Sequence, residues 1–425
     1  MKKIFGIVIL LLFIIFGYLY LNYNNIEEDN ISFFSNVEIL EAEINDYYIF
    51  GNHFNIFGKL NIENNDYNYS LVIKNEDEEY TLDCIFEKKD GYISFYTSSK
   101  LNTGINLDEL NKGKYYLLIK EENGENIKYY SLINNTTYDN MEYYTITKND
   151  SNNKVNIIFD SIKENNRKVN YIMIKVEKTK LPKNVYDITI DPGHGGVDTG
   201  AYYKYNGNSY NEADFTLDIA LKLKKELEKN GYKVLLTRDK NEDLEYYNAS
   251  GRAVLPNKYH TKLCISLHLN SEKNMNYGGV EVYTPNDIEY SLARLLASNI
   301  SKINGYSKKK FNKIEDGIYF NGFTEESIIS ANEENEKNGL KKYDIEVGTP
   351  QMYMIREVGG KLTHAYVDGR NEKYGLNPYY QSNQVAEPYL IELGYINYEA
   401  DLIKFINNSN DFSVSIKNSL IEYLK

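Results

Sequence analysis

His194 is the first residue whose type and position could support chemistry. It stands in the glycine-rich run Asp191–Gly196, which directly follows the apolar stretch Tyr186–Ile190. That stretch predicts a buried strand. A turn just beyond a strand end is where open α/β sheets gather their functional groups. A histidine there is poorly placed to fill a core, so we expect its partners at other strand ends.

Three further polar residues stand at the ends of predicted elements. Glu212 begins a predicted helix, His268 closes a predicted strand, and Glu392 interrupts the apolar run Leu390–Leu393. Taken singly, Glu212 and His268 have structural explanations. A glutamate at a helix start complements the helix dipole, and a histidine at a strand end is often a hydrogen-bonded structural group. Glu392 is harder to explain, since carboxylates are almost never fully buried unless they are paired.

Together, the four residues predict a hydrolytic metal site. Two imidazoles and one carboxylate form the three-ligand set of catalytic zinc, which leaves one position open for water. A separate carboxylate can then take the proton of the water and return it to a leaving amine. This chemistry cleaves amide bonds without a nucleophilic serine.

Other chemistries fit the sequence less well. A phosphate loop at Gly193–Gly196 would need the G-x-G-x-x-G spacing or a Walker Lys-Ser/Thr, and the run has neither. The G-x-S-x-G motif of serine hydrolases and the H-E-x-x-H motif of common zinc peptidases are also absent from the sequence. The two cysteines, Cys84 and Cys264, form no metal-type pair, so histidine and carboxylate must hold any metal.

Strands and helices alternate after a predicted linker at residues 178–184. Amphipathic helices are predicted at 213–230 and 291–303, and a C-terminal helical segment from 400 onward. The pattern predicts an α/β domain over residues 185–425 with an open, mainly parallel sheet flanked by helices. Its predicted strands are 185–190, 232–236, 263–267, 279–283, 351–355 and 388–393.

Residues 30–180 show only short strands separated by turns. This pattern predicts a β-sandwich-like accessory domain without a chemical constellation, interpreted as a spacer or docking module. Its tyrosines indicate only weakly a face that could stack on carbohydrate rings. The predicted strands are 54–62, 69–73, 79–86, 91–96, 114–120 and 128–132.

The N-terminus predicts a membrane signal. Lys2 and Lys3 precede the charge-free run Ile4–Leu21, which as a helix nearly matches a hydrocarbon core of about 30 Å. We predict residues 1–24 to be a single-pass signal anchor that leaves the rest of the chain outside the cytoplasm. Secretion after signal cleavage is the alternative.

The motifs of residues 185–425 resemble those of the zinc-dependent N-acetylmuramoyl-L-alanine amidases. The resemblance opens at Ile188–Gly196 and ends at Glu392–Asn397. Between them it passes through Glu212, Leu235–Asp239, Arg252, Ser266–Asn270 and Gly279–Tyr283.

The resemblance implies a role for each matching residue. His194, Glu212 and His268 match the zinc ligands, and Glu392 matches the catalytic carboxylate. Arg252 matches a support position of the family, and Asn270 is a further candidate for substrate binding or support.

The implied activity is cleavage of peptidoglycan at the amide between N-acetylmuramic acid and L-alanine. The partners would be glycan strands with stem peptides, the membrane through the N-terminal helix, and a protein partner through the β-rich domain. A net charge of −13 argues against nucleic acid. The alternatives are a zinc peptidase of peptidoglycan cross-links and a non-catalytic wall-binding scaffold.

Two stretches depart from the simplest forms of the family. Residues 202–210 are extra and are expected to loop out. Residues 305–387 are longer than needed and include the acidic, helix-like segment Phe323–Asn335 and His364. That segment is interpreted either as a surface insertion or as a regulatory lid, and His364 either as structural or as a substrate contact.

Overall fold

The structure is a computed structural model. It describes residues 38–425 except 41, 63–66, 76, 133–137, 146–151, 165–166, 246–249, 274–277, 340–341, 343–344 and 360–382. The predicted signal anchor at residues 1–24 and His364 lie outside the described residues. Among the described residues, no helix has both the length and the apolar character needed to cross a membrane.

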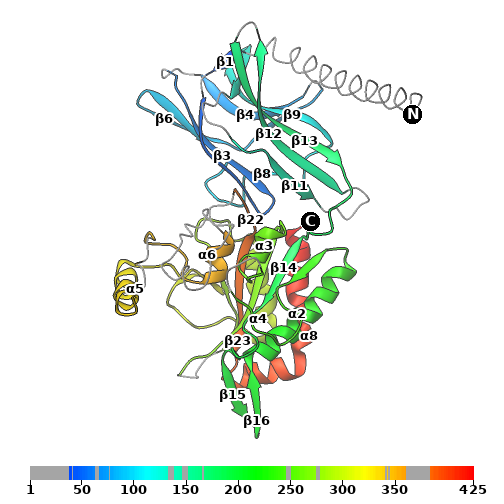
Figure 1. Cartoon of the computed structure of the whole chain (residues 1–425), viewed down its shortest axis with the longest axis vertical. Coiled ribbons are helices and arrows are strands. Elements are labelled where there is room, and N and C mark those ends of the chain that lie inside the picture. Colours follow the sequence, from blue (N-terminus) through cyan, green and yellow to red (C-terminus); the bar gives the residue numbers. More distant parts are fainter. Residues whose placement is uncertain are drawn as a thin grey trace, which may run out of the picture.

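Two sheets form the N-terminal β-region, residues 38–178 (Figure 1). One sheet has the order β1-β10-β9-β13-β12-β11, with β4 and β5 attached through β9, and the other runs β2-β3-β7-β6 with β8 on β3. The strands are β1 (Glu38–Leu40), β2 (Ala42–Phe50), β3 (His53–Leu60), β4 (Asn68–Lys74), β5 (Glu79–Leu82), β6 (Ile85–Lys89), β7 (Tyr92–Tyr96), β8 (Ile105–Asn106), β9 (Gly113–Asn123), β10 (Asn126–Leu132), β11 (Met141–Thr145), β12 (Asn153–Glu164) and β13 (Arg167–Lys178).

The two sheets enclose one apolar core. Ile49 and Phe54 from one sheet are buried in the same cluster as Leu117 and Ile174 from the other. The single strand predicted at 79–86 is wrong, because β5 and β6 belong to different sheets and the chain crosses between them at Asp83–Cys84.

The C-terminal part is an α/β unit, as predicted. Its seven-stranded sheet has the order β17-β14-β18-β23-β19-β21-β20, and the central pairs β17/β14, β14/β18 and β18/β23 are parallel. The strands are β14 (Ile188–Pro192), β17 (Val234–Leu236), β18 (Leu263–Asn270), β19 (Glu281–Tyr283), β20 (Lys313–Glu315), β21 (Ile318–Tyr319) and β23 (Glu387–Tyr395). The helices are α2 (Glu212–Lys229), α3 (Leu255–Lys258), α4 (Ser291–Asn304), α5 (Glu325–Lys337), α6 (Tyr353–Gly359) and α8 (Glu399–Tyr423).

Side-chain alternation along the strands separates the two faces of this sheet. Ile265 and Leu267 of β18 and Ile391 of β23 enter the main core, which also contains the apolar stripes of α2, α4 and α8. In α2 that stripe is Ile219, Leu223 and Leu227, which recur every four residues. The intervening positions of both strands point to the opposite face, toward α6.

One prediction for the α/β unit is wrong. Residues 351–355 do not form a strand but lead into helix α6, whose Met354 and Val358 pack one turn apart against Cys264. The extra residues 202–210 extend away from the unit as a hairpin of β15 (Tyr202–Tyr205) and β16 (Asn208–Asn211), which projects in Figure 1. Its turn is Asn206-Gly207, where both residues have positive φ.

The two regions share structure at their junction. The short strand β22 (Gln384–Val385) of the C-terminal part pairs in parallel with β2 and so extends a sheet of the β-region. From the other side, Tyr48 and Phe50 of β2 are buried in the α/β core. The junction lies at the amino-terminal ends of β18 and β23, opposite the ends that carry His268 and Glu392.

A buried carboxylate forms part of this junction. Glu387, at the start of β23, is fully buried and accepts hydrogen bonds from Asn102 of the β-region, Tyr389 and Tyr423. Asn102 also donates to the backbone carbonyl of Glu289. Burial raises the pKa of Glu387 to about 7, against the lowering effect of these three hydrogen bonds.

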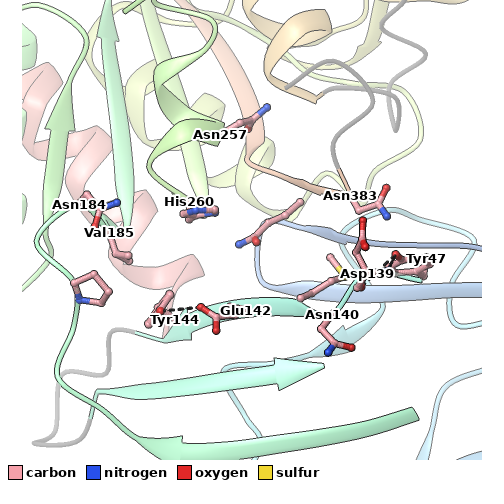
Figure 2. A pocket seen from close by; sticks show the side chains of 13 residues that line it. Tyr47, Asp139, Asn140, Glu142, Tyr144, Asn184, Val185, Asn257, His260 and Asn383 are labelled. Atoms are coloured by element: carbon pink, nitrogen blue, oxygen red, sulfur yellow. Dashed lines mark hydrogen bonds between the residues drawn. The ribbon is translucent and has the colours of Figure 1, made fainter. Parts of the chain in front are cut away.

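An open pocket of about 680 Å³ also lies between the two regions (Figure 2). Tyr47, Glu142 and Tyr144 line it from the β-region, and His260 and Asn257 line it from the α/β unit. The six predicted site residues do not line this pocket, so the junction and the candidate site are separate places.

The raised pKa of Glu387 predicts a pH-dependent stability. The folded chain holds this proton up to about pH 7, whereas the ordinary pKa of the group is 4.5. The stabilisation is therefore complete below pH 4.5 and is lost as pH rises through about 7, with a difference of about 3 kcal/mol. Glu387→Gln should flatten the fall in unfolding temperature between about pH 5 and pH 8. Parallel curves for the two proteins would contradict the assignment.

Candidate active site

The turn after β14 has a backbone that only a few residue types can form. His194 has a φ of 61°, and Gly195 and Gly196 have φ values of 136° and 62°. A Cβ on Gly193 would lie 2.5 Å from Cε1 of His268, so a larger residue would displace the second histidine. The glycines therefore bring the backbone and the two imidazoles close together.

Two buried arginines hold the carbonyl groups of this turn. Arg238 donates to the carbonyl oxygens of Pro192 and Gly193 at 3.1 and 2.9 Å. Arg252 donates to those of Pro192 and His194 at 3.2 and 2.9 Å. These hydrogen bonds satisfy carbonyl groups that the sharp turn leaves without strand partners.

Asp191 ties this turn to the neighbouring strands. Its carboxylate accepts hydrogen bonds from Thr237 at 2.6 Å and Ser266 at 2.7 Å, and Nε of Arg252 lies 3.4 Å away. Burial alone would raise the pKa of Asp191, but the charge of Arg252 and the two hydroxyl hydrogen bonds outweigh it and lower the pKa. Arg252 is thus the counter-charge of a fully buried carboxylate.

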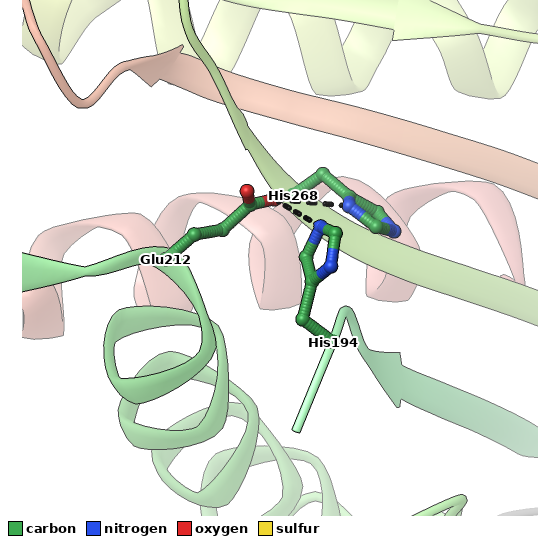
Figure 3. Close-up of side chains that lie close together, drawn as sticks. All are labelled: His194, Glu212 and His268. Carbon is green, nitrogen blue, oxygen red and sulfur yellow. Dashed lines mark hydrogen bonds and ion pairs between the residues drawn. The ribbon is translucent and has the colours of Figure 1, made fainter. Parts of the chain in front are cut away.

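His194, Glu212 and His268 converge on one point, as Figure 3 shows. Nε2 of His194 lies 3.1 Å from Oε1 of Glu212, and Nδ1 of His268 lies 3.0 Å from the same oxygen. One ligand atom from each residue lies within 4.8 Å of the others. The structure therefore brings these three predicted residues together.

Hydrogen bonds orient each member of this cluster. Nδ1 of His194 lies 2.9 Å from Oδ2 of Asp198, which leaves Nε2 facing Glu212. Glu212 accepts from the backbone N–H groups of Leu269 and Ala201 at 2.9 and 2.8 Å. A histidine–carboxylate hydrogen bond of this kind fixes the ring orientation of a metal ligand.

The cluster favours an ionised Glu212. Burial raises the pKa of this carboxyl, but hydrogen bonds from His194 and His268 outweigh burial and lower it well below its usual range. Burial lowers the pKa of His194, and the hydrogen bond and charge of Glu212 outweigh that effect and raise it. The carboxylate thus attracts positive charge to the point where the three residues meet.

Glu392 lies in the next strand, directly opposite His268 in the register. Its Oε2 atom is buried and has no hydrogen-bond partner among the described residues. Burial raises the pKa of Glu392 well above its usual range, the charges of Glu212 and Glu281 add to this effect, and Lys309 opposes it.

Glu281 is a further buried carboxylate at this edge, in β19 and opposite Glu392 in the antiparallel register. Asn270 donates to it at 3.3 Å, so this predicted site residue, two residues beyond His268 in β18, supports Glu281 two strands away in the sheet. The other donors are the hydroxyls of Ser307, Tyr283 and Tyr395 and the ammonium of Lys309.

Sequence reasoning did not single out several residues of the site. Glu281 interrupts the apolar run Val280–Tyr283 just as Glu392 interrupts its own strand, so the same signal was present. Asp198 lies four residues after His194 and showed no pattern of its own. The role of Arg238 depends on carbonyl groups, which have no sequence signal.

A model of the family described as N-acetylmuramoyl-L-alanine amidase matches residues 188–422, more than half of the chain. The chain belongs to this family. Family membership confirms the predicted activity, which is hydrolysis of the amide between N-acetylmuramic acid and L-alanine in peptidoglycan. His194, Glu212, His268 and Glu392 all lie within the matched residues of this amidase.

Two relatives agree with this assignment. A protein of Buchnera aphidicola subsp. Baizongia pistaciae, named as an N-acetylmuramoyl-L-alanine amidase, is 31% identical over 167 residues, which cover 31% of this amidase and 74% of the relative. The Staphylococcus aureus protein called probable cell wall amidase LytH is 34% identical over 125 residues, or 29% of this amidase and 40% of that protein.

Solved structures of N-acetylmuramoyl-L-alanine amidases are also similar. AmiC2 of Nostoc punctiforme matches with a TM-score of 0.36 and 20% identity over 57% of this amidase and 97% of that chain. The amidase of Clostridium difficile 630 matches with a TM-score of 0.36 and 24% identity over 57% of this amidase and 98% of that chain.

The position of Arg252 predicts a stability effect as well as a loss of activity. Arg252→Met would leave Asp191 ionised and buried without its counter-charge, so we expect a loss of about 3 kcal/mol of folding free energy. Thermal unfolding and the hydrolysis rate would measure the two effects. Lys240→Met is the matched control, because Lys240 is exposed and should leave both unchanged. An Arg252→Met variant as stable as the wild type would contradict the buried ion pair.

Proposed function

We propose that this amidase is a zinc hydrolase in which His194, Glu212 and His268 hold the metal and Glu392 is the catalytic carboxylate. The observation that carries the proposal is the convergence of two imidazole nitrogens and one carboxylate oxygen within 4.8 Å. Glu392, in the neighbouring strand, supplies a separate carboxylate beside this cluster.

The donor set fits zinc in its chemistry. Imidazole and carboxylate ligands in a three-residue site with an open fourth position are typical of catalytic zinc. Cysteine sulfur does not take part, since Cys264 is buried against α6 and Cys84 lies in the β-region. The Asp198–His194 hydrogen bond supplies the outer contact that metal-binding histidines usually have.

The residues of the chain have separate tasks in this proposal. A zinc ion in such a site acts as a Lewis acid and activates water at neutral pH. Glu392 takes the proton of the attacking water and transfers it to the nitrogen of the leaving alanine. Asp198 holds the ring of His194, and Arg238 and Arg252 hold the turn that carries it.

The substrate places this reaction outside the cytoplasm. Peptidoglycan lies there, and the S. aureus relative is named as a cell wall amidase. We propose that the signal predicted at residues 1–24 exports the chain, either as an anchor or before cleavage. We also propose that the β-region positions the α/β unit on the wall or on a protein partner.

Substitutions of the site residues test the assignment. His194→Ala and His268→Ala should lose both bound zinc and hydrolysis, because each removes one of three ligands. Glu392→Gln should keep zinc and lose turnover by about a hundredfold or more, because it removes the proton carrier. Metal analysis of the purified protein and release of amino groups from peptidoglycan would measure these effects.

Two controls sharpen this test. His260→Ala removes a histidine at the distant junction pocket, and Glu399→Gln removes an exposed glutamate, so both should keep zinc and activity. A Glu392→Gln variant that hydrolyses peptidoglycan at the wild-type rate would contradict the mechanism. Mass spectrometry of the products separates an amidase, which frees L-alanine amino termini, from a peptidase that cuts cross-links.

A further inference from the structure

Lys309 is a half-buried cation beside the proposed catalytic carboxylate. It follows β19 and α4 in the chain and precedes β20 and β21. Its side chain is 30% exposed and lies near the rings of Tyr283 and Tyr319, with Nζ 5.4 and 5.9 Å from their centroids. Its charge opposes the upward shift that burial, Glu212 and Glu281 impose on the pKa of Glu392.

The backbone of Lys309 is also held in place. Its N–H donates to the hydroxyl of Ser307 at 3.2 Å, and its carbonyl accepts a hydrogen bond from Tyr319 at 2.9 Å. Ser307 donates in turn to Glu281 at 2.7 Å. The lysine is therefore positioned by the same network that surrounds Glu281, and a positioned charge loses less entropy when it binds a ligand.

Neutralisation of Glu281 does not fully account for this lysine. Glu281 already accepts hydrogen bonds from Asn270, Ser307, Tyr283 and Tyr395. The distance from Nζ to Oε2 of Glu281 is 3.4 Å, longer than the roughly 2.7–2.9 Å of a strong charge-assisted hydrogen bond. The ammonium of Lys309 instead makes its short hydrogen bond to the neutral hydroxyl of Tyr283, at 2.7 Å. An ammonium has three donors, so it retains capacity for an acceptor on its exposed side.

The strand order indicates which part of the substrate passes this cation. His268, Glu392 and Glu281 follow one another across the adjacent strands β18, β23 and β19. Lys309 contacts Glu281, so it lies beyond Glu392 as seen from the metal cluster. The leaving nitrogen must contact Glu392, because this residue protonates it. A stem peptide that leaves the cluster on the Glu392 side would therefore run toward Lys309.

We propose that Lys309 is a specificity-determining residue that binds a carboxylate of the stem peptide on the leaving-amine side of the scissile amide. This inference rests on the proposed roles of the metal cluster and Glu392. It assigns to Lys309 the recognition of an acidic group next to the cleaved bond, and to Glu281 and Tyr283 the positioning of that lysine.

Two peptidoglycan preparations test the proposal. They differ only in whether the second residue of the stem peptide carries a carboxylate or the corresponding carboxamide, and kcat/KM is measured for each. The wild-type enzyme should prefer the carboxylate form by about fivefold or more, the size expected for one charge-assisted hydrogen bond in a half-exposed site. Lys309→Met should bring that ratio close to one, and Lys309→Arg should keep most of it.

Lys310→Met is the matched control, because Lys310 is the next residue and is exposed. It should keep the wild-type ratio, and thermal unfolding of the Lys309 variants confirms that they are folded. The proposal is overturned if the wild type shows no preference or the opposite one, or if Lys309→Met leaves the ratio unchanged. It is also overturned if Lys309→Met slows both substrates equally, since the lysine would then act through Glu392. Failure of the wild type to cleave either substrate would instead contradict the proposed function.

Discussion

The register of three neighbouring strands is the constraint on which the rest of this structure depends. Because β14, β18 and β23 pair in parallel, their carboxyl ends meet at one edge of the sheet. The turn with His194, the end of β18 with His268, and Glu392 in β23 are brought together only by this pairing. A slip of one residue in β18 or β23 would turn its side chain to the other face, into the packing of α2, α4 and α8.

Buried carboxylates at this edge are surrounded by hydrogen-bond donors and counter-charges. Asp191 has Arg252 and two hydroxyl groups, Glu212 has two imidazoles and two backbone N–H groups, and Glu281 has five donors. Glu392 differs from them, because one of its oxygen atoms is buried without a partner in the part of the chain that the structure describes. A carboxylate without such a partner, between hydrogen-bonded neighbours, suits a group that must exchange a proton with a substrate.

The β-region is attached at the opposite edge of the same sheet. Strand β22 continues a sheet of the β-region, and Asn102 reaches Glu387 at the first residue of β23. The strand that carries Glu392 at its far end is therefore anchored in the junction at its near end. The accessory structure therefore packs at the end of the strands opposite the site.

Much of the site follows from local signals in the chain. The glycines around His194 predict a sharp turn, the apolar strands predict an α/β unit, and a glutamate within an apolar run marks Glu392. These signals are local because φ restrictions, side-chain periodicity and the cost of burying a charge act within a few residues.

Only the tertiary structure decided which groups complete the site. Arg238 acts through carbonyl groups and Lys309 through partners distant in the sequence, and neither leaves a pattern there. Asp198 lies four residues after His194 without a pattern of its own. Glu281 interrupts an apolar strand as Glu392 does, but only its contacts join it to the site. The helix at 353–359 and the hairpin at 202–211 were likewise decided by packing and pairing, since α6 is held by contacts with β18 and the hairpin by its cross-strand bonds.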